Sequence, residues 1–372
     1  MKNSQRFLCT VCQSEDLQSS LSFGKQFPSN RFVSPESEGV VKDDSYSLSL
    51  GYCLRCGTIQ LVDRMPIEAV RPRYDWLVYK EPEGHLDDVA NRLEGLPKLN
   101  KSSRFLGVTY KDKSILDRMN RLGFANAECV NESDLKCPVQ PFGLESIQGA
   151  LTTDSTIKHL RGAYGSSDVL IARHIIEHTS DSNHLISSLR GLLASEGYIM
   201  LELPDSERIL SAGNHAFIWE EHISYFTETS IKTLAKIVGA ELVWLTRYSY
   251  PFEDSLIVLL RFSGAEAIPL ETSSEIPKDS ATILAEFVKE LHASRTKWHK
   301  KLEALRVKGE RVAVFGAGHL AAKFINFYEL VDLIDCVIDD HPEKVGMLMP
   351  GSHLPIVSSV EMESRGIQVC IS

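Results

Sequence analysis

The sequence has no apolar run of the roughly 18 residues that a membrane-spanning helix needs. It also lacks an excess of positive charge, since its 372 residues carry a formal net charge of -10. Nucleic acid is therefore not an expected partner, because phosphate binding needs concentrated lysine and arginine. Residues 1–6 (MKNSQR) contain no apolar stretch typical of a signal peptide. We expect a cytoplasmic protein that binds neither membranes nor nucleic acids.

The chain has only eight cysteines, and four of them form two CxxC pairs, Cys9 with Cys12 and Cys53 with Cys56. In a cytoplasmic protein, thiols or metal ligands are more common than disulfides. Each pair offers two thiolates from one tight turn, and zinc prefers four such ligands in a tetrahedron. A redox role is less favoured because no βαβ pattern surrounds either pair. The spacing therefore predicts a structural zinc site, in which four cysteines leave no open position for a substrate.

Beyond residue 101, short apolar segments alternate with helix-like ones, of which 114–122 is the first. The strand-like segments are 104–108, 169–172, 198–204, 241–245 and 256–260. Strands separated by helices are typical of an α/β fold with a mainly parallel, doubly wound sheet. Ligands bind beyond the carboxyl ends of the strands in such sheets. Residues in those positions are therefore candidates for function.

Two short runs place a carboxylate directly beside an imidazole, each after a strand-like segment. They are 173–178 (RHIIEH) and 219–226 (WEEHISYF). Histidine has the side-chain pKa nearest neutrality, and an adjacent carboxylate can orient and tune it. The two runs favour proton-transfer chemistry. The alternative is structural: the glutamates would cap or salt-bridge helices, and the histidines would be satisfied within the fold.

The C-terminal part begins with a long helix predicted over 279–305, whose apolar residues recur at three- and four-residue steps. Such a seam can pair helices between subunits, but we favour a helix that lies on its own domain, in a monomer or homodimer. Residues 311–322 (RVAVFGAGHLAA) then predict a strand, a GxGxxA turn and a helix. A second strand over 334–338 ends at Asp339, the spacing of a Rossmann fingerprint. Taken alone, this pattern indicates NAD, with Asp339 on the ribose.

Several motifs together resemble one family. Residues 168–178 (DVLIARHIIEH) resemble the fourth-strand motif of class I S-adenosylmethionine-dependent methyltransferases. With the run 219–226, the two CxxC pairs and the segment 23–32 (FGKQFPSNRF), the chain is similar to the zinc-containing sugar C-methyltransferases. Those enzymes methylate C3 of nucleotide-linked 4-keto-6-deoxy sugars.

The resemblance implies a class I methyltransferase-like doubly wound sheet with an N-terminal zinc-binding module and a C-terminal Rossmann-like domain. We expect the zinc module over 1–70, the methyltransferase-like domain over 71–265, a linker helix over 266–310 and the Rossmann-like domain over 311–372. In this family the last domain helps to hold the nucleotide sugar, which we favour over NAD binding.

The resemblance also implies a mechanism in which a base removes the proton next to a ketone and the enolate attacks the methyl group of the cofactor. His222 would be the base, Glu221 its orienting partner, His178 a second polar group near the sugar and Tyr225 a donor to the substrate. The residues expected to bind the nucleotide-sugar substrate are Tyr74, Trp76, Trp219, Gly316, Gly318 and His319.

The residues expected around S-adenosylmethionine are Gly107, Asp112, Glu132, Arg173 and His174. The loop 107–114 (GVTYKDKS) departs from the family, because Lys113 stands where a second glycine is expected. A lysine there would bring a positive charge near the cationic sulfonium. The departure leaves an alternative: a cofactor-independent keto-sugar epimerase or isomerase, or a non-catalytic homologue that has lost S-adenosylmethionine binding.

Overall fold

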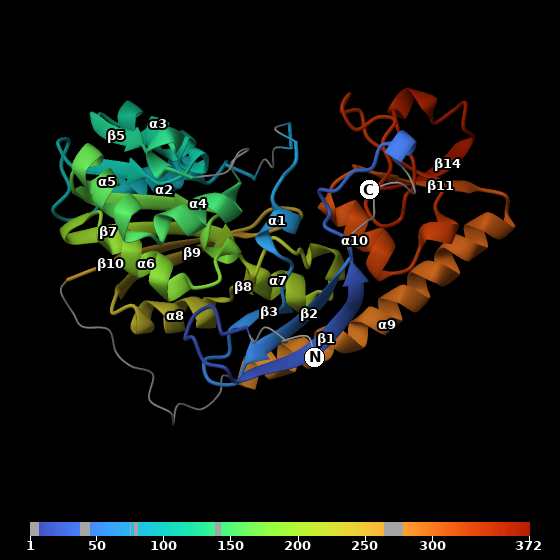
Figure 1. Ribbon diagram of the computed structural model, residues 1–372, viewed down its shortest axis with the longest axis horizontal. Helices are drawn as coiled ribbons and strands as arrows, with labels where there is room; N and C mark the ends of the chain where they lie inside the picture. Colours follow the sequence, from blue (N-terminus) through green and yellow to red (C-terminus); the bar gives the residue numbers. More distant parts are fainter. Residues whose placement is uncertain (1–6, 38–44, 75, 78–80, 138–142, 264–277) are drawn as a thin grey trace.

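The computed structural model describes residues 7–37, 45–74, 76–77, 81–137, 143–263 and 278–372 (Figure 1). Within these residues the chain forms two four-stranded sheets and one six-stranded sheet. The N-terminal sheet is antiparallel and contains β1 (Leu17–Gln26), β2 (Tyr46–Cys53), β3 (Ile59–Asp63) and β8 (Ser224–Tyr225). Its fourth strand, β8, comes from the second histidine run, and Ile59 pairs with Tyr225. The sheet therefore anchors that run to the zinc module.

The central sheet has the order β5-β4-β6-β7-β10-β9. Its strands are β4 (Arg104–Gly107), β5 (Asn126–Cys129), β6 (Ser167–Arg173), β7 (Leu193–Pro204), β9 (Glu241–Tyr248) and β10 (Ser255–Arg261). The first four are parallel to one another, and β10 is antiparallel to both β7 and β9. This is the class I methyltransferase-like arrangement, so the prediction of a mainly parallel α/β sheet is confirmed.

Helices cover both faces of the central sheet (Figure 1). On one face lie α2 (Leu86–Glu94) and α3 (Lys113–Arg121). On the other lie α4 (Leu144–Leu151), α5 (Asp154–Tyr164), α6 (Ser182–Arg190) and α8 (Glu228–Ile237). In β6, Val169 packs in the core under α2 and α3, whereas Leu170 packs in the core on the other face, because successive side chains of a strand point to opposite faces. A strand buried on both faces reads as a continuous apolar run, which explains why it was visible in the sequence.

The C-terminal sheet is parallel, with the order β13-β12-β11-β14. It contains β11 (Arg311–Phe315), β12 (Cys336–Ile338), β13 (Ile356–Val357) and β14 (Ile367–Ile371), and α10 (His319–Phe327) follows β11. In Figure 1, α10 lies on the side of this sheet that faces the central domain. Its first turn therefore reaches the space between the two domains.

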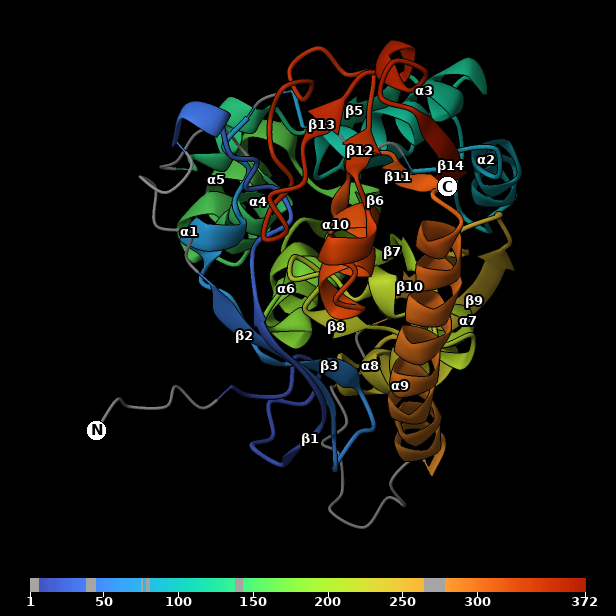
Figure 2. The same cartoon turned by 90° about the vertical axis from the view of Figure 1, so that its right-hand side faces the viewer.

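The long helix α9 (Lys278–Val307) runs from the zinc module to β11 (Figure 2). Its apolar residues Leu284, Phe287 and Leu291 are buried in one core with residues of β2, β3 and β11. The apolar seam of α9 thus packs against the chain itself. Among the described residues, no helix combines the length and the apolar character needed to cross a bilayer. Two short helices complete the fold near the site, α1 (Ile67–Val70) and α7 (Ser206–Ser211).

Candidate active site and zinc site

The four predicted cysteines come together in one cluster. The sulfur atoms of Cys9, Cys12, Cys53 and Cys56 all lie within 4.8 Å of one another. Cys9 Sγ is 3.4 Å from Cys56 Sγ, and Cys12 Sγ is 3.5 Å from Cys53 Sγ. Four thiolates about 2.3 Å from a zinc ion are about 3.8 Å apart, so the cluster fits zinc. Gly57 makes the second turn possible with φ +75°.

The zinc turn is tied directly to the second histidine run. Thr10, which follows the first zinc ligand, accepts a hydrogen bond from Ser224 Oγ at 2.8 Å and donates its backbone N–H to Gln60 at 2.9 Å. Leu61 N donates to Ile223 O at 2.9 Å. A zinc ion held by the four cysteines would therefore stabilise the turn to which residues 219–226 are hydrogen-bonded.

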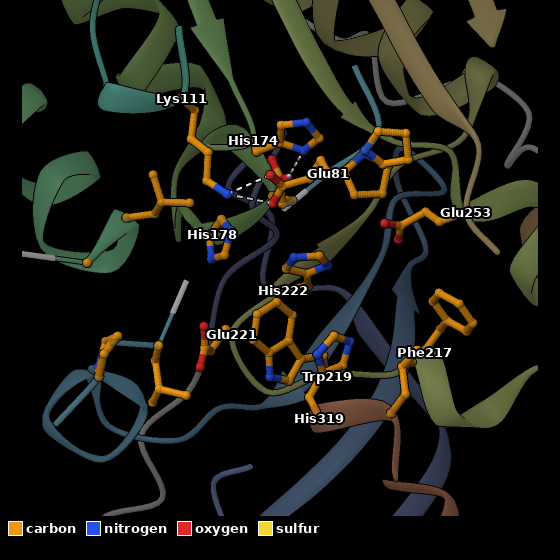
Figure 3. Close-up of a pocket in the computed structure, with 18 of the residues that line it drawn as sticks. Glu81, Lys111, His174, His178, Phe217, Trp219, Glu221, His222, Glu253 and His319 are labelled. Carbon is orange, nitrogen blue, oxygen red and sulfur yellow. Dashed lines mark hydrogen bonds and ion pairs between the residues drawn. The ribbon is translucent and has the colours of Figure 1, made fainter. Parts of the chain in front are cut away.

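A cavity of about 620 Å³ lies beyond the carboxyl ends of β4, β5, β6 and β7. Its volume is in the range of small-molecule binding sites. The acidic, basic and histidine side chains that line it are Glu81, Lys111, Glu132, His174, Glu177, His178, Glu221, His222, Glu253 and His319, and all of these except Glu132 and Glu177 are labelled in Figure 3. They come from the central domain, from the segment before α2 and from the first turn of α10. The cavity is thus placed where a doubly wound sheet is expected to bind its ligands.

The two histidine runs meet in this cavity. His178 belongs to a short 3-10 helix, η4 (Ile176–His178), and its ring is perpendicular to that of His222, with the ring centroids 4.9 Å apart. The ring centroid of Trp219 lies 4.8 Å from that of His222 and 4.3 Å from that of His319, on which the Trp219 ring stacks. The result is a wall of four rings that joins the central domain to the C-terminal domain (Figure 3).

The charges of these histidines differ. Burial lowers the pKa of His222 well below its ordinary value, and His178 and His319 lower it further. Burial also lowers the pKa of His174, but the carboxylates of Glu202 and Glu177 outweigh it and raise that pKa to about 10. At neutral pH, His222 therefore has a free lone pair while His174 is a cation. Only the first can accept a proton.

Glu221, the expected partner of His222, is buried and accepts a hydrogen bond from Asn30 Nδ2 at 3.0 Å. The neighbouring Glu220 forms a buried ion pair with Lys323 of α10 at 2.6 Å and accepts hydrogen bonds from Ser29. The two glutamates therefore connect the second run to the zinc module and the C-terminal domain. That Glu221 orients His222 remains a prediction.

Three of the predicted cofactor residues hold the loop after β4 in place. Asp112 is buried and accepts hydrogen bonds from Val108 N and Thr109 N, both at 2.8 Å, and from Arg173 N at 2.9 Å. Gly107 is required by this turn, because a Cβ there would lie 2.6 Å from Asp112 Cβ. The side chain of Arg173 is buried and contacts Glu202. Within the described part of the chain, the cavity wall includes none of Gly107, Asp112 and Arg173.

The expectation for Lys113 is wrong. Its side chain is exposed at the start of α3 and pairs with Asp117 at 3.3 Å. Lys111 faces the cavity instead, and its Nζ lies 2.6 and 2.7 Å from the two carboxylate oxygens of Glu81. The error arose because the short helix η2 (Tyr110–Asp112) turns the side chain two positions earlier inwards.

The residues at this end of the cavity fit S-adenosylmethionine in their chemistry. Glu132 follows β5 and lines the cavity, so its carboxylate can accept hydrogen bonds from ribose hydroxyls. Tyr110 and Leu144 offer apolar surface for a purine. The charge of Lys111 is offset by Glu81, so the pair does not repel a sulfonium as a free lysine would.

The predicted substrate residues separate into two groups. Tyr74, Trp219 and His319 line the cavity. Trp76 does not line it and instead packs against Tyr74 and His341, with both ring centroids 4.9 Å away. Among the described residues, the cavity wall includes neither Gly316 nor Gly318, although they set up the turn that presents His319.

Tyr225 and Asp339 are occupied by backbone contacts. The hydroxyl of Tyr225 accepts from Trp219 N at 2.8 Å and donates to Trp219 O at 3.1 Å, outside the cavity wall. It therefore fixes Trp219 and does not reach the cavity. Asp339 accepts from Ala317 N at 2.9 Å and from Lys344 Nζ at 3.0 Å. These bonds close its own loop, so the site does not favour a ribose of NAD there.

Sequence reasoning missed Glu81, Lys111 and Glu253 as cavity residues. Glu81 and Lys111 pair across 30 positions, and no local pattern announces such a contact. Glu253 lies in a turn between β9 and β10, and burial raises its pKa to about 7.

Models of three protein families match the chain in succession. A zinc-binding domain matches residues 9–70, a methyltransferase domain residues 84–245 and a C-methyltransferase C-terminal domain residues 267–370. This chain belongs to the zinc-containing, S-adenosylmethionine-dependent C-methyltransferase family. The four-cysteine cluster within the matched zinc-binding domain indicates a structural zinc ion, and the matched methyltransferase domain indicates S-adenosylmethionine as the second cofactor. No curated protein matches the chain.

Several solved structures are distantly similar. A variant of LepI in complex with SAH and a substrate analogue is 12% identical over 50% of this chain and 50% of that chain, with a TM-score of 0.31. The 1,6-didemethyltoxoflavin-N1-methyltransferase of Burkholderia thailandensis is 12% identical over 47% and 76%, with a TM-score of 0.31. The DszA carbon methyltransferase is 16% identical over 49% and 55%, with a TM-score of 0.32. The chain spans half the length of the first of these proteins.

Proposed function

We propose that this protein transfers a methyl group from S-adenosylmethionine to the carbon beside the carbonyl of a nucleotide-activated keto sugar. The observation that carries the proposal is the position of His222. Its ring is neutral, half-buried and in the wall of a cavity that also reaches Glu132. A neutral imidazole in a cavity can take a proton from a carbon acid.

Each part of the cavity has a role in this proposal. His222 removes the proton next to the carbonyl, and His178, whose ring contacts it, binds a neighbouring sugar oxygen. The cationic His174 favours the negative charge that develops on the carbonyl oxygen. When bound, S-adenosylmethionine supplies an electrophilic methyl group, and Glu132 and Tyr110 hold its nucleoside. Trp219 and His319 form a stacked surface for the sugar or for the nucleobase of the nucleotide sugar.

The test is a transfer assay with a nucleoside-diphosphate 4-keto-6-deoxy sugar and S-adenosylmethionine, in which demethylated cofactor is measured. Replacing His222 with alanine is expected to lower kcat about 10²- to 10⁴-fold, the usual contribution of a general base. His184→Ala is the control, because His184 is exposed on α6. Unchanged turnover in His222→Ala would rule out the proposed base.

One observation favours a second candidate, enolisation without methyl transfer. The loop after β4 is not glycine-rich but is closed by Thr109 and Asp112, and it presents Lys111 to the cavity. Such a site can exchange the proton beside a carbonyl and so epimerise the sugar. Deuterium incorporation from solvent in the absence of cofactor, with no transfer in its presence, would decide for this candidate.

A further inference from the structure

We propose that Glu177, His178 and His222 form a second metal site, suited to a divalent transition-metal ion, in the wall of the cavity. One ligand atom from each residue lies within 4.8 Å of the others. Ligand atoms about 2.1 Å from one ion are about 3.0 to 3.5 Å apart, so the three side chains need to close by only about 1 to 2 Å. Rotation of the side chains can supply this movement.

The carboxylate of Glu177 is the strongest sign of a ligand. The residue is only 2% exposed, and within the described part of the chain neither carboxylate oxygen has a hydrogen-bond partner. His174 Nδ1 forms an ion pair with Glu177 Oε1 at 3.7 Å, a distance longer than that of a hydrogen bond. A buried carboxylate without hydrogen bonds is costly, and an ion is one of the few things that satisfies it.

The backbone fixes the three residues relative to one another. Glu177 and His178 are adjacent in η4, and Ile223 N donates to Glu177 O at 2.7 Å, which places His222 beside them. The perpendicular rings of His178 and His222 converge from different directions. All three side chains line the cavity, so an ion held there would keep coordination positions open to water or a substrate oxygen.

The ligand set indicates the class of metal. Two imidazoles and one carboxylate suit Fe²⁺, Mn²⁺, Co²⁺ or Zn²⁺, whereas Ca²⁺ and Mg²⁺ prefer oxygen ligands alone. Three more acidic residues, Glu81, Glu221 and Glu253, line the cavity. They favour a bound cation and so help to offset its repulsion by the positive charges of Lys111 and His174. The four-cysteine cluster is different in kind, because it offers only sulfur and is closed.

This inference goes beyond the proposed reaction and does not depend on it. A nitrogen of His222 that binds a cation cannot accept a proton at the same time. The cation-bound and base-competent forms of the site therefore exclude each other. A binding experiment separates the two proposals, because it needs no turnover.

The experiment is a titration of the full-length, zinc-loaded protein with Co²⁺, followed by calorimetry and visible absorption. One equivalent of Co²⁺ is expected to bind with weak d–d bands and without an intense sulfur-to-cobalt band, while the zinc content stays unchanged. X-ray absorption at the cobalt edge should then show a shell of nitrogen and oxygen with imidazole scattering. Sulfur in that shell, or no binding of Co²⁺ in addition to the zinc already present, would overturn the proposal.

The second part of the experiment measures Co²⁺ binding by variants of the cavity residues. Glu177→Gln and His178→Ala are each expected to weaken Co²⁺ binding at least about 10-fold. His319→Ala, which alters the same cavity outside the three ligands, should leave the Kd within about twofold. The zinc content of each variant reports whether it has folded, and the spectra of the wild-type protein test the site without any variant. Equal loss in all three variants would contradict the assignment.

Discussion

The backbone N–H of Ile223 donates to the carbonyl oxygen of Glu177 at 2.7 Å and so joins the two histidine runs. The first run follows a strand of the central sheet, and the second leads into β8 of the zinc module's sheet. This bond helps to keep His178 and His222 neighbours, although their two runs adjoin different sheets. The chemistry of the cavity thus depends on how the zinc module docks onto the central domain.

Ile223→Pro removes this donor and is expected to separate the two histidine rings. Losing one buried backbone hydrogen bond should lower the free energy of unfolding by about 1–3 kcal/mol, because the carbonyl of Glu177 is left without its partner. Ile223→Ala keeps the N–H and is the matched control. Thermal unfolding gives the stability, and the transfer assay gives the activity. Equal behaviour of the two variants would show that the bond does not hold the site together.

Removal of the zinc should lower turnover, although the zinc ligands lie outside the cavity wall. Cys53→Ser is expected to lose most of the metal, because three cysteines remain from a four-cysteine site. Because β3 pairs with β8, the run 219–226 should then lose its support, and turnover should fall with the zinc content. Cys370→Ser is the control, since Cys370 is exposed at the far end of the chain. Metal analysis and the transfer assay are the measurements, and full activity in metal-free Cys53→Ser would contradict the coupling.

The features that the sequence predicted are local ones. The four zinc ligands follow from two CxxC spacings, and strands such as β6 follow from apolar runs buried on both faces. Lys113 was misplaced for a local reason too, since aligning the loop by motif cannot show how η2 turns the side chains.

Contacts between distant segments were not predictable from the sequence. Two examples are the ion pairs Glu81–Lys111 and Glu220–Lys323. Each joins segments that are far apart along the chain, and a single sequence does not reveal such contacts. Which members of the histidine runs face the cavity also depends on packing. Tyr225 has the sequence context of a substrate donor, yet its hydroxyl is bound to the backbone of Trp219.

The buried pair of Glu220 and Lys323 should be important for docking the C-terminal domain. Both side chains are 0% exposed, and Nζ lies 2.6 Å from Oε2. Lys323→Met leaves a buried carboxylate without its counterion and is expected to cost about 3–5 kcal/mol. The double variant with Glu220→Gln should recover part of this loss, because no charge then remains uncompensated. Denaturant unfolding of the single and double variants measures the coupling, and additive losses would show that the two charges do not interact.

Glu253 should make stability depend on pH. Its pKa is raised to about 7 by burial, from an ordinary 4.5. The folded state therefore holds a proton between pH 4.5 and 7 that the unfolded chain has released, so the contribution of Glu253 is present below pH 4.5 and is lost as the pH rises through 7. Over this window the wild-type protein should lose at most about 3 kcal/mol relative to Glu253→Gln, since one pKa unit corresponds to about 1.4 kcal/mol and the partly exposed side chain is screened. Unfolding free energies of both proteins, measured from pH 4 to 8, test this. A difference that stays constant with pH would mean that Glu253 titrates at its ordinary pKa.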